Sequence, residues 1–207
     1  MIDPIINEIP GQELQRKRIV YPGVGIYYGY TKNGAPHGKG VMRYDIDGDK
    51  PCEIYIGDWK QAKRHGKGTF TKHNDTYVGD WVNDEKHGKG NSLNINGEYI
   101  GQWKNGNWDG HGTKIENSGT KYVGQFVKGK EIGMGTKYMI DGSKYNGNWS
   151  RMDMNGEGSI EYANKDKFVG YLWKSFYQGD GTWYDNINKK AYICKWLMGD
   201  MSPYYKI

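Results

Sequence analysis

The clearest chemical pattern in the sequence is a histidine and a lysine on either side of one glycine, repeated three times. If these triplets recur on neighbouring parts of a regular fold, they form a row of positive charge. Such a row could dock an acidic partner, such as a phosphoinositide headgroup, an acidic tubulin-like tail or an acidic protein surface. We call the six flanking residues the basic ladder: His37, Lys39, His65, Lys67, His87 and Lys89.

No comparable pattern points to catalysis or metal binding. Successive ladder histidines would lie too far apart to share one ion at ligand distances of about 2 Å. Cys52 and Cys194 have no partner at metal-ligand spacing, and nucleophile-elbow and zinc-protease motifs are absent. The Gly-Lys-Gly triplets do not fit the phosphate-binding loop, which needs serine or threonine after the lysine. We therefore expect a non-enzymatic protein with no catalytic residues, metal site or cofactor.

The ladder residues belong to an internal repeat that covers most of the chain. Each copy has an aromatic residue first, glycine at +2, an aromatic residue at +4, and glycines at +11 and +13. Weaker copies begin at Tyr27 and Phe168, and a degenerate copy begins at Tyr192. Five complete copies begin at Tyr55, Tyr77, Tyr99, Tyr122 and Tyr145. In three consecutive copies the first three pattern positions are Tyr55, Gly57, Trp59, Tyr77, Gly79, Trp81, Tyr99, Gly101 and Trp103.

The spacing within each copy predicts two strands. Positions 0, +2 and +4 share a parity, as do +11 and +13, and side chains of a strand alternate between faces. Each copy then forms a hairpin with about six residues between its strands, such as Lys60 to His65. The rings would lie over hollows left by the glycines on the same face, with the basic ladder on the opposite face. At about 4.8 Å per strand, each copy lengthens an antiparallel sheet by about 9.6 Å.

Composition agrees with such a sheet. The 207 residues include 32 glycines, 18 tyrosines and 8 tryptophans but only 4 leucines, so a leucine-packed helical core is excluded. The net charge of +5 is small and mixed along the chain, which argues against disorder and against nucleic-acid binding. No apolar run approaches the roughly 18 residues of a membrane span, and the start lacks a signal-peptide pattern. We expect a cytoplasmic protein that is not secreted and has no transmembrane segment.

The pattern Y-x-G-x-W-x6-G-x-G, seen from Tyr77 to Gly90, resembles the MORN repeat (membrane occupation and recognition nexus). The resemblance covers residues 27 to about 205. It implies an elongated, twisted antiparallel sheet of about eight tandem hairpins. It also implies a non-catalytic role as a scaffold, a subunit of cytoskeletal assemblies including ciliary radial spokes, a dimerising rod, or a binder of anionic lipids. Bacterial choline-binding repeats are a rival resemblance, but they belong to exported proteins.

The repeat also predicts how the chain is divided. Residues 1–26 match no copy and are expected to cap the first hairpin or to grip a partner. Residues 27–191 hold seven repeats, with first residues at 27, 55, 77, 99, 122, 145 and 168. Residues 192–207 form a degenerate eighth repeat and C-terminal cap. This end is unusually apolar, so we expect it to pack against another protein or another copy through Tyr192, Trp196, Leu197, Met198, Met201, Tyr204 and Tyr205.

Two functions from different classes remain. The first is a scaffold that makes protein contacts in a multi-subunit cytoskeletal or ciliary assembly, such as a radial-spoke-like structure in the axoneme. The alternative is a peripheral membrane protein that binds anionic phospholipids through the basic ladder. A simpler interpretation of the ladder, which we favour, is that these residues belong to the repeat and keep one sheet face soluble, because charges about a Debye length apart (~8 Å) act weakly together.

Overall fold

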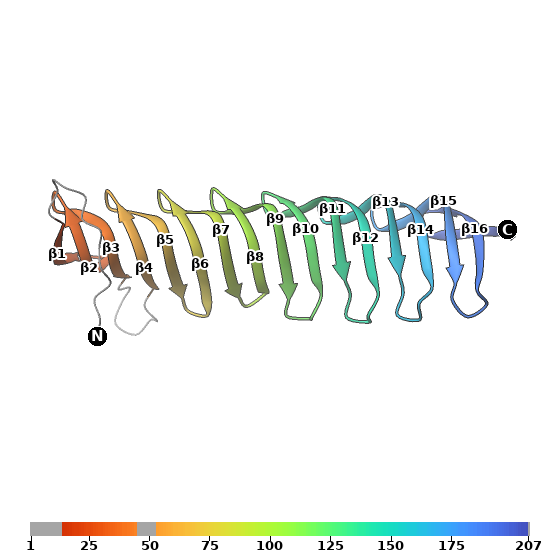
Figure 1. The fold of residues 1–207 in the computed structure, drawn as a ribbon, viewed down its shortest axis with the longest axis horizontal. Coiled ribbons are helices and arrows are strands. Elements are labelled where there is room, and N and C mark those ends of the chain that lie inside the picture. The colour runs from red at the N-terminus through yellow and green to blue at the C-terminus, as the bar shows by residue number, and fades with distance from the viewer. Residues whose placement is uncertain (1–13, 45–52, 207) are drawn as a thin grey trace. The chain divides into compact units, whose positions relative to one another are not determined.

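The computed structural model describes residues 14–44 and 53–206, and every regular element within these ranges is a β-strand (Figure 1). Strands that follow one another in each unit pair antiparallel, which confirms the predicted all-β class of tandem hairpins. No helix in the described part of the chain has the length and apolar character needed to cross a bilayer. The first two repeats begin 28 residues apart, at Tyr27 and Tyr55, which predicts a turn-rich insertion around residues 45–51; this segment lies outside the described residues.

The chain forms two compact units that divide between Glu85 and Lys86. Unit 1 contains the first six strands, which pair as neighbours in chain order. They are β1 (Gln15–Tyr21), β2 (Gly25–Lys32), β3 (Ala35–Tyr44), β4 (Glu53–Lys60), β5 (Lys63–Lys72) and β6 (Asp75–Val82).

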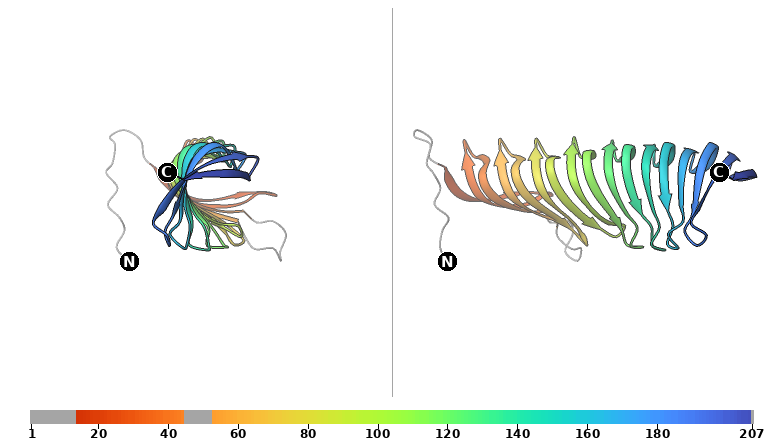
Figure 2. Two further views of the ribbon diagram at one scale, coloured as in Figure 1. Left: turned by 90° about the vertical axis from the view of Figure 1, so that its right-hand side faces the viewer. Right: turned by 45° about the vertical axis from the view of Figure 1, so that its right-hand side comes forward.

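Unit 2 contains the remaining strands, again paired as neighbours in chain order. The strands of each unit are bent and twisted (Figure 2). Unit 2 holds β7 (Glu85–Asn94), β8 (Gly97–Lys104), β9 (Asn107–Glu116), β10 (Lys121–Val127), β11 (Lys130–Tyr138), β12 (Lys144–Ser150), β13 (Asp153–Glu161), β14 (Lys167–Trp173), β15 (Phe176–Asp185), β16 (Lys190–Leu197) and β17 (Asp200–Lys206).

The turn inside each repeat is shorter than the sequence suggested. In the second repeat β4 ends at Lys60 and β5 begins at Lys63, so two residues form the turn rather than about six. Both Gln61 and Ala62 have positive φ, 51° and 61°, which is the pattern of a type I′ turn. This turn matches the right-handed twist of the flanking strands, so pairing continues beyond the last aromatic residue.

The tyrosine rings lie on one face of the sheet, which we call the ring face. Tyr55 is fully buried, and glycines at +2 and +13 leave room for its ring, because a Cβ on Gly68 would lie 2.5 Å from its Cε2 and Cζ atoms. The Tyr55 hydroxyl donates to the carbonyl of Asp58 at 2.9 Å. The same +3 bond recurs at 2.6–3.3 Å for Tyr27, Tyr77, Tyr99, Tyr122 and Tyr145.

The +4 indole joins one repeat to the repeat before it. Trp81 donates from Nε1 to the carbonyl of Gly68 at 3.1 Å. Its ring meets Tyr77 of its own repeat and Tyr55 of the preceding one edge to face, with centroids 5.1 and 5.3 Å apart. Edge-to-face pairs contribute about 0.5–1.5 kcal/mol each beyond burial. A row of interlocked rings therefore replaces a leucine core, as the composition predicted.

The glycine at +11 has a different role from the one predicted. Gly66 has a φ of +58°, and the register of β4 and β5 shifts between Gly57 and Asp58. A Cβ on Gly66 would meet the Asp58 carboxylate, not a ring. The glycine therefore forms a β-bulge, whose left-handed backbone L side chains disfavour. The Asp58 carboxylate holds this bulge by accepting the backbone N–H of Lys67 at 2.8 Å.

A second lateral connection runs along the turns. The N–H of Ala62 donates to the carbonyl of Pro36 at 2.9 Å, which links the second residue of a turn to position +9 of the preceding repeat. Equivalent bonds of 2.9–3.1 Å are made by Asp84, Gly106, Gly129, Met152, Ser175 and Gly199. Repeats are therefore joined at their tips as well as along their strands.

Candidate interaction surfaces

The lysines of the basic ladder that lie in unit 1 are ion-paired within the sheet. Lys39 Nζ lies 2.6 Å from Asp58 Oδ1, and Lys67 Nζ lies 2.5 Å from Asp80 Oδ1. Both pairs sit directly opposite each other across adjacent strands, on the outer face, which is the face away from the rings. The acids at +3 therefore offset the charge of the preceding repeat's lysine.

The remaining ladder residues occupy matching places. His37 lies on β3 beside Lys39, and His65 lies on β5 opposite Asp58. The Nδ1 atom of His65 lies 3.5 Å from the backbone N of Asn83, at the limit of a hydrogen bond. His87 and Lys89 lie on β7 of unit 2, where Lys89 faces Gln102. The histidines are therefore distributed over separate strands. Residues 14–44 and 53–206 contain no group of three His, Cys, Asp or Glu side chains able to hold a metal ion.

The apolar C-terminal end is divided between buried and exposed side chains. Trp196 is 7% exposed and packs against Tyr177 and Phe168, with centroids 4.6 and 5.9 Å away. Its Nε1 has no hydrogen-bond partner among the described residues, unlike the indoles at +4 in earlier repeats. Leu197 and Met198 are 67% and 60% exposed. Tyr192 is half-buried on β16, whereas the side chains of Met201, Tyr204 and Tyr205 lie outside the described part.

Position +9, counted from the first aromatic residue of a repeat, is a candidate contact position that the sequence pattern did not reveal. Its side chain lies on the ring face over the aromatic pair, and its type changes from one repeat to the next. The Arg64 guanidinium lies 4.4 Å from the Trp81 ring centroid, and Trp108 stacks on Tyr99 with centroids 4.5 Å apart. The fixed distance from the first residue was an available signal, but a variable residue type does not stand out in a search for recurring residues.

The fifth repeat carries a buried charge at this position. Glu131 is 5% exposed, and its carboxylate lies 3.6 Å from Lys114 Nζ. Burial raises the pKa of Glu131, although Lys114 and Lys137 act in the opposite direction. Lys114 is closer to Glu116, at 2.7 Å, and this hydrogen bond lowers the pKa of Glu116. At +9, the ring face of unit 2 therefore carries a base, an aromatic ring and an acid in successive repeats, namely Lys86, Trp108 and Glu131.

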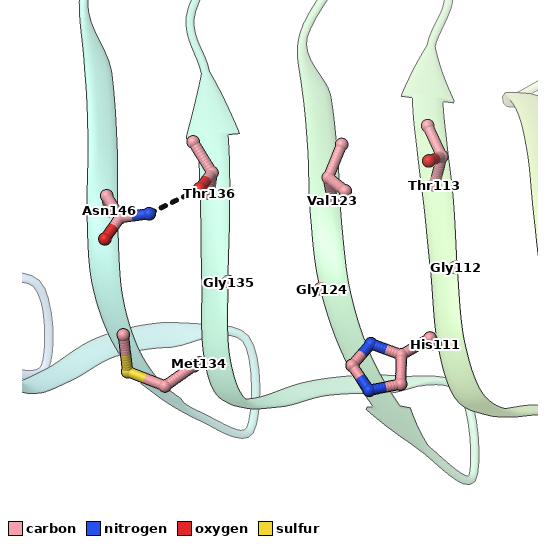
Figure 3. Close-up of a pocket in the computed structure, with 9 residues that line it drawn as sticks. All are labelled: His111, Gly112, Thr113, Val123, Gly124, Met134, Gly135, Thr136 and Asn146. Carbon is pink, nitrogen blue, oxygen red and sulfur yellow. Dashed lines mark hydrogen bonds between the residues drawn. The ribbon is translucent and has the colours of Figure 1, made fainter.

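The outer face of unit 2 has a shallow hollow over β9 to β12 (Figure 3). Val123 is 38% exposed and Met134 is 54% exposed there. Asn146 donates to the hydroxyl of Thr136 at 2.6 Å along the rim. The hollow is therefore a mixed apolar and hydrogen-bonding surface.

The first strand of unit 1 has a strong charge bias. β1 contains three bases, Arg16, Lys17 and Arg18, and no acid. On the outer face, the guanidinium carbon of Arg16 lies 5.4 Å from the Tyr30 ring and that of Arg18 lies 5.8 Å from the Tyr28 ring. A charge count over residues 1–26 conceals this bias because three acids before residue 14 cancel it.

Comparison with protein families agrees with the geometry. The family model described as MORN repeat matches residues 23–47, 55–76, 77–92, 99–120 and 122–144. The hairpins from Lys144 onward keep the same ring face, since Tyr145 and Phe168 are fully buried. MORN repeats are interaction modules for proteins or lipids. A comparison of the whole chain with curated proteins found no match.

Proposed function

We propose that this chain, which belongs to the MORN-repeat family, is a non-enzymatic scaffold that holds protein partners in a larger assembly. The observation that carries the proposal is that the packing of the ring face is the same in successive repeats, whereas the side chains of the outer face differ between them. The ring face keeps the same aromatic and glycine packing, while the cross-strand pair on the outer face changes from Lys67 with Asp80 to Met134 with Asn148. Each repeat therefore offers different contact chemistry at a fixed spacing, which suits a multi-partner scaffold.

We further propose that this assembly is cytoplasmic and associated with the cytoskeleton, and that the specific candidate is a ciliary, radial-spoke-like structure. It rests on the resemblance of the tandem repeats to those of subunits of such assemblies. The exposed Leu197 and Met198 at the C-terminal end are the proposed protein contact there, with a partner or with a second copy.

Cross-linking within the native assembly tests the scaffold. The chain is tagged in its own cells, cross-linked, purified at physiological salt and analysed by mass spectrometry. We expect the same set of proteins in each preparation, with cross-links to lysines of several repeats. A chain that elutes as a monomer from native extract and gives no intermolecular cross-link would contradict the proposal. Microscopy of the tagged chain tests the ciliary assignment separately.

Anionic lipid binding through the basic ladder is the alternative, and the three bases of β1, Arg16, Lys17 and Arg18, favour it. The ion pairs of Lys39 and Lys67 count against it, since a headgroup must compete with Asp58 and Asp80. Vesicle flotation with and without phosphatidylserine, at two salt concentrations, separates the two functions because lysine-driven binding falls steeply with salt. Replacing Lys39, Lys67 and Lys89 by glutamate should abolish flotation if the ladder binds lipid. The matched control replaces the exposed lysines 63, 104 and 130.

A further inference from the structure

We propose that the first strand, β1, binds an acidic, extended segment of a partner protein by strand addition. This inference rests on the scaffold function proposed above and names the chemistry of one of its contacts. Strand addition needs an exposed sheet edge with backbone groups directed outward, and side chains that select the incoming strand. Both features are present on β1, at the N-terminal edge of unit 1 (Figure 1).

The backbone of β1 has one side directed away from the sheet. β1 pairs with β2 from Gln15 to Tyr21, and it pairs with no other strand of residues 14–44 and 53–85. The hydroxyl of Thr31 donates to the carbonyl of Gln15 at 3.1 Å, so this carbonyl points toward β2. Successive residues of a strand direct their backbone groups to opposite sides. Arg16, Arg18 and Val20 therefore direct their N–H and C=O groups away from β2.

The side chains of the same three residues determine which incoming strand would pair with β1. Arg16, Arg18 and Val20 lie opposite Tyr30, Tyr28 and Ile26 and share the outer face. The Arg18 Nε donates to the Tyr28 hydroxyl at 3.1 Å, which positions the guanidinium above the sheet. Val20 is 51% exposed. An incoming antiparallel strand would place one residue against Val20, and the next two residues of the same face against the two guanidiniums.

Charge complementarity identifies the occupant. Cross-strand neighbours of opposite charge stabilise a sheet, and like charges destabilise it. Since β1 itself carries Arg16, Lys17 and Arg18 and no acid, a basic strand is repelled, including β1 of a second copy. The last strand of a second copy, β17, carries one acid and one base and is a poor match. The best occupant is an extended segment with an apolar residue followed by two acids at alternate positions.

Fluorescence anisotropy with short labelled peptides tests this pattern on the full chain. The test peptide has valine, glutamate and glutamate at alternate positions, separated by threonines. One control has the same composition with the two glutamates adjacent, so that they fall on opposite faces. A second control keeps the sequence but carries an N-methyl group on the amide that would pair with Arg18. We expect binding of the test peptide and at least about tenfold weaker binding of both controls.

Variants of the protein test the edge. Arg18→Glu should weaken binding of the test peptide about tenfold, because it converts an attractive cross-strand pair into a repulsive one. Val20→Pro should weaken it similarly, since it removes an N–H on the outward side while the pairing with β2 remains. Arg43→Glu, with the same change in net charge on β3, should alter binding less than about twofold. Circular dichroism checks that each variant folds.

Other outcomes would overturn the inference. Equal binding of the N-methylated peptide would exclude strand addition. Arg18-dependent binding of phosphatidylserine vesicles or of a single-stranded oligonucleotide, without peptide binding, would assign the edge to another class of partner. Dimerisation lost in Arg18→Glu would assign it to a second copy. If the peptide fails to bind but tagged Arg18→Glu still purifies with the partners of the native chain, strand addition fails and the scaffold stands; if the native chain has no partners, the scaffold itself fails.

Discussion

Replacing Gly68 by alanine tests whether the glycine row exists to receive the tyrosine rings. The added Cβ would lie 2.5 Å from two ring carbons of Tyr55, where carbon contacts normally lie at about 3.5–4.0 Å. The backbone has little freedom to retreat, because Gly68 pairs with Gly57 on one side and Gly79 on the other. The ring must therefore leave its hollow.

The cost follows from what Tyr55 loses. Its side chain is fully buried, its hydroxyl donates to Asp58, and its ring meets both Trp59 and Trp81 edge to face. Exposing a buried aromatic side chain costs about 3–5 kcal/mol, which includes these contacts. We expect Gly68→Ala to lower the free energy of unfolding of unit 1 by about that amount.

Urea unfolding followed by circular dichroism and tryptophan fluorescence measures this cost, and a double-mutant cycle with Tyr55→Ala tests its cause. Truncation of Tyr55 removes the three atoms nearest to the added methyl group, so the cost of Gly68→Ala should fall below about 1 kcal/mol. An equal cost in both backgrounds would refute the proposed role of the glycine. A cost below about 1 kcal/mol in the native background would refute it as well.

Three further predictions concern ionisation and turns. Burial raises the pKa of Tyr27, Tyr99 and Tyr145 to about 12, so stability should hold up to the ordinary tyrosine pKa near 10 and fall as the pH rises from there to about 12, as seen in thermal melts. Glu131→Gln should raise the melting temperature at neutral pH, because burial raises the pKa of Glu131 and the neutral amide lacks the ionisation that opposes folding. Ala62→Gly should stabilise unit 1 by about 0.5–1 kcal/mol in urea unfolding, because Ala62 has a φ of 61°.

Each of these predictions has a matched control. The melting temperature should follow tyrosinate absorbance, and unfolding that begins well below pH 10 would contradict the tyrosine explanation. Glu116→Gln should act in the opposite direction from Glu131→Gln at neutral pH, because Lys114 lowers the pKa of Glu116. Gly106 occupies the same turn position in the fourth repeat with open space around it, so Gly106→Ala should destabilise, and a gain there would contradict the turn argument.

The sequence predicted the hairpins and the ring face because rings and glycines recur at strand spacing. As predicted, Gly57 and Gly68 leave room for the Tyr55 ring, because a Cβ on either glycine would clash with the tyrosine side chain. The role of Gly66 was not predictable from parity, because the bulge leaves both Gly66 and Lys67 without a partner on β4, and the positive φ of Gly66 changes the side to which a Cβ would point. The length of the turn at Gln61 was also misjudged, since polar residues beyond the last ring extend the strands.

The charged surfaces were harder to predict. The sequence located Lys39 and Lys67 as a row of bases, but their pairing with acids of the next repeat depends on strand register. Position +9 combines Arg64, Trp108 and Glu131, and these residue types share no chemistry that a pattern search would group. The structure groups them because each lies on the ring face at the same place in its hairpin.

The indole bond from Trp81 to Gly68 and the turn bond from Ala62 to Pro36 both reach from one repeat into the one before it. A hairpin cut from its predecessor thus loses acceptors, whereas a whole additional hairpin brings the acceptors that its successor needs. Duplication or deletion of a complete repeat within a unit should therefore be tolerated during evolution. Insertion of a single strand would reverse the chain direction and leave these donors unmatched. Such a protein can change in length by steps of about 9.6 Å, and partners bound to different repeats can be moved apart without any change in their binding sites.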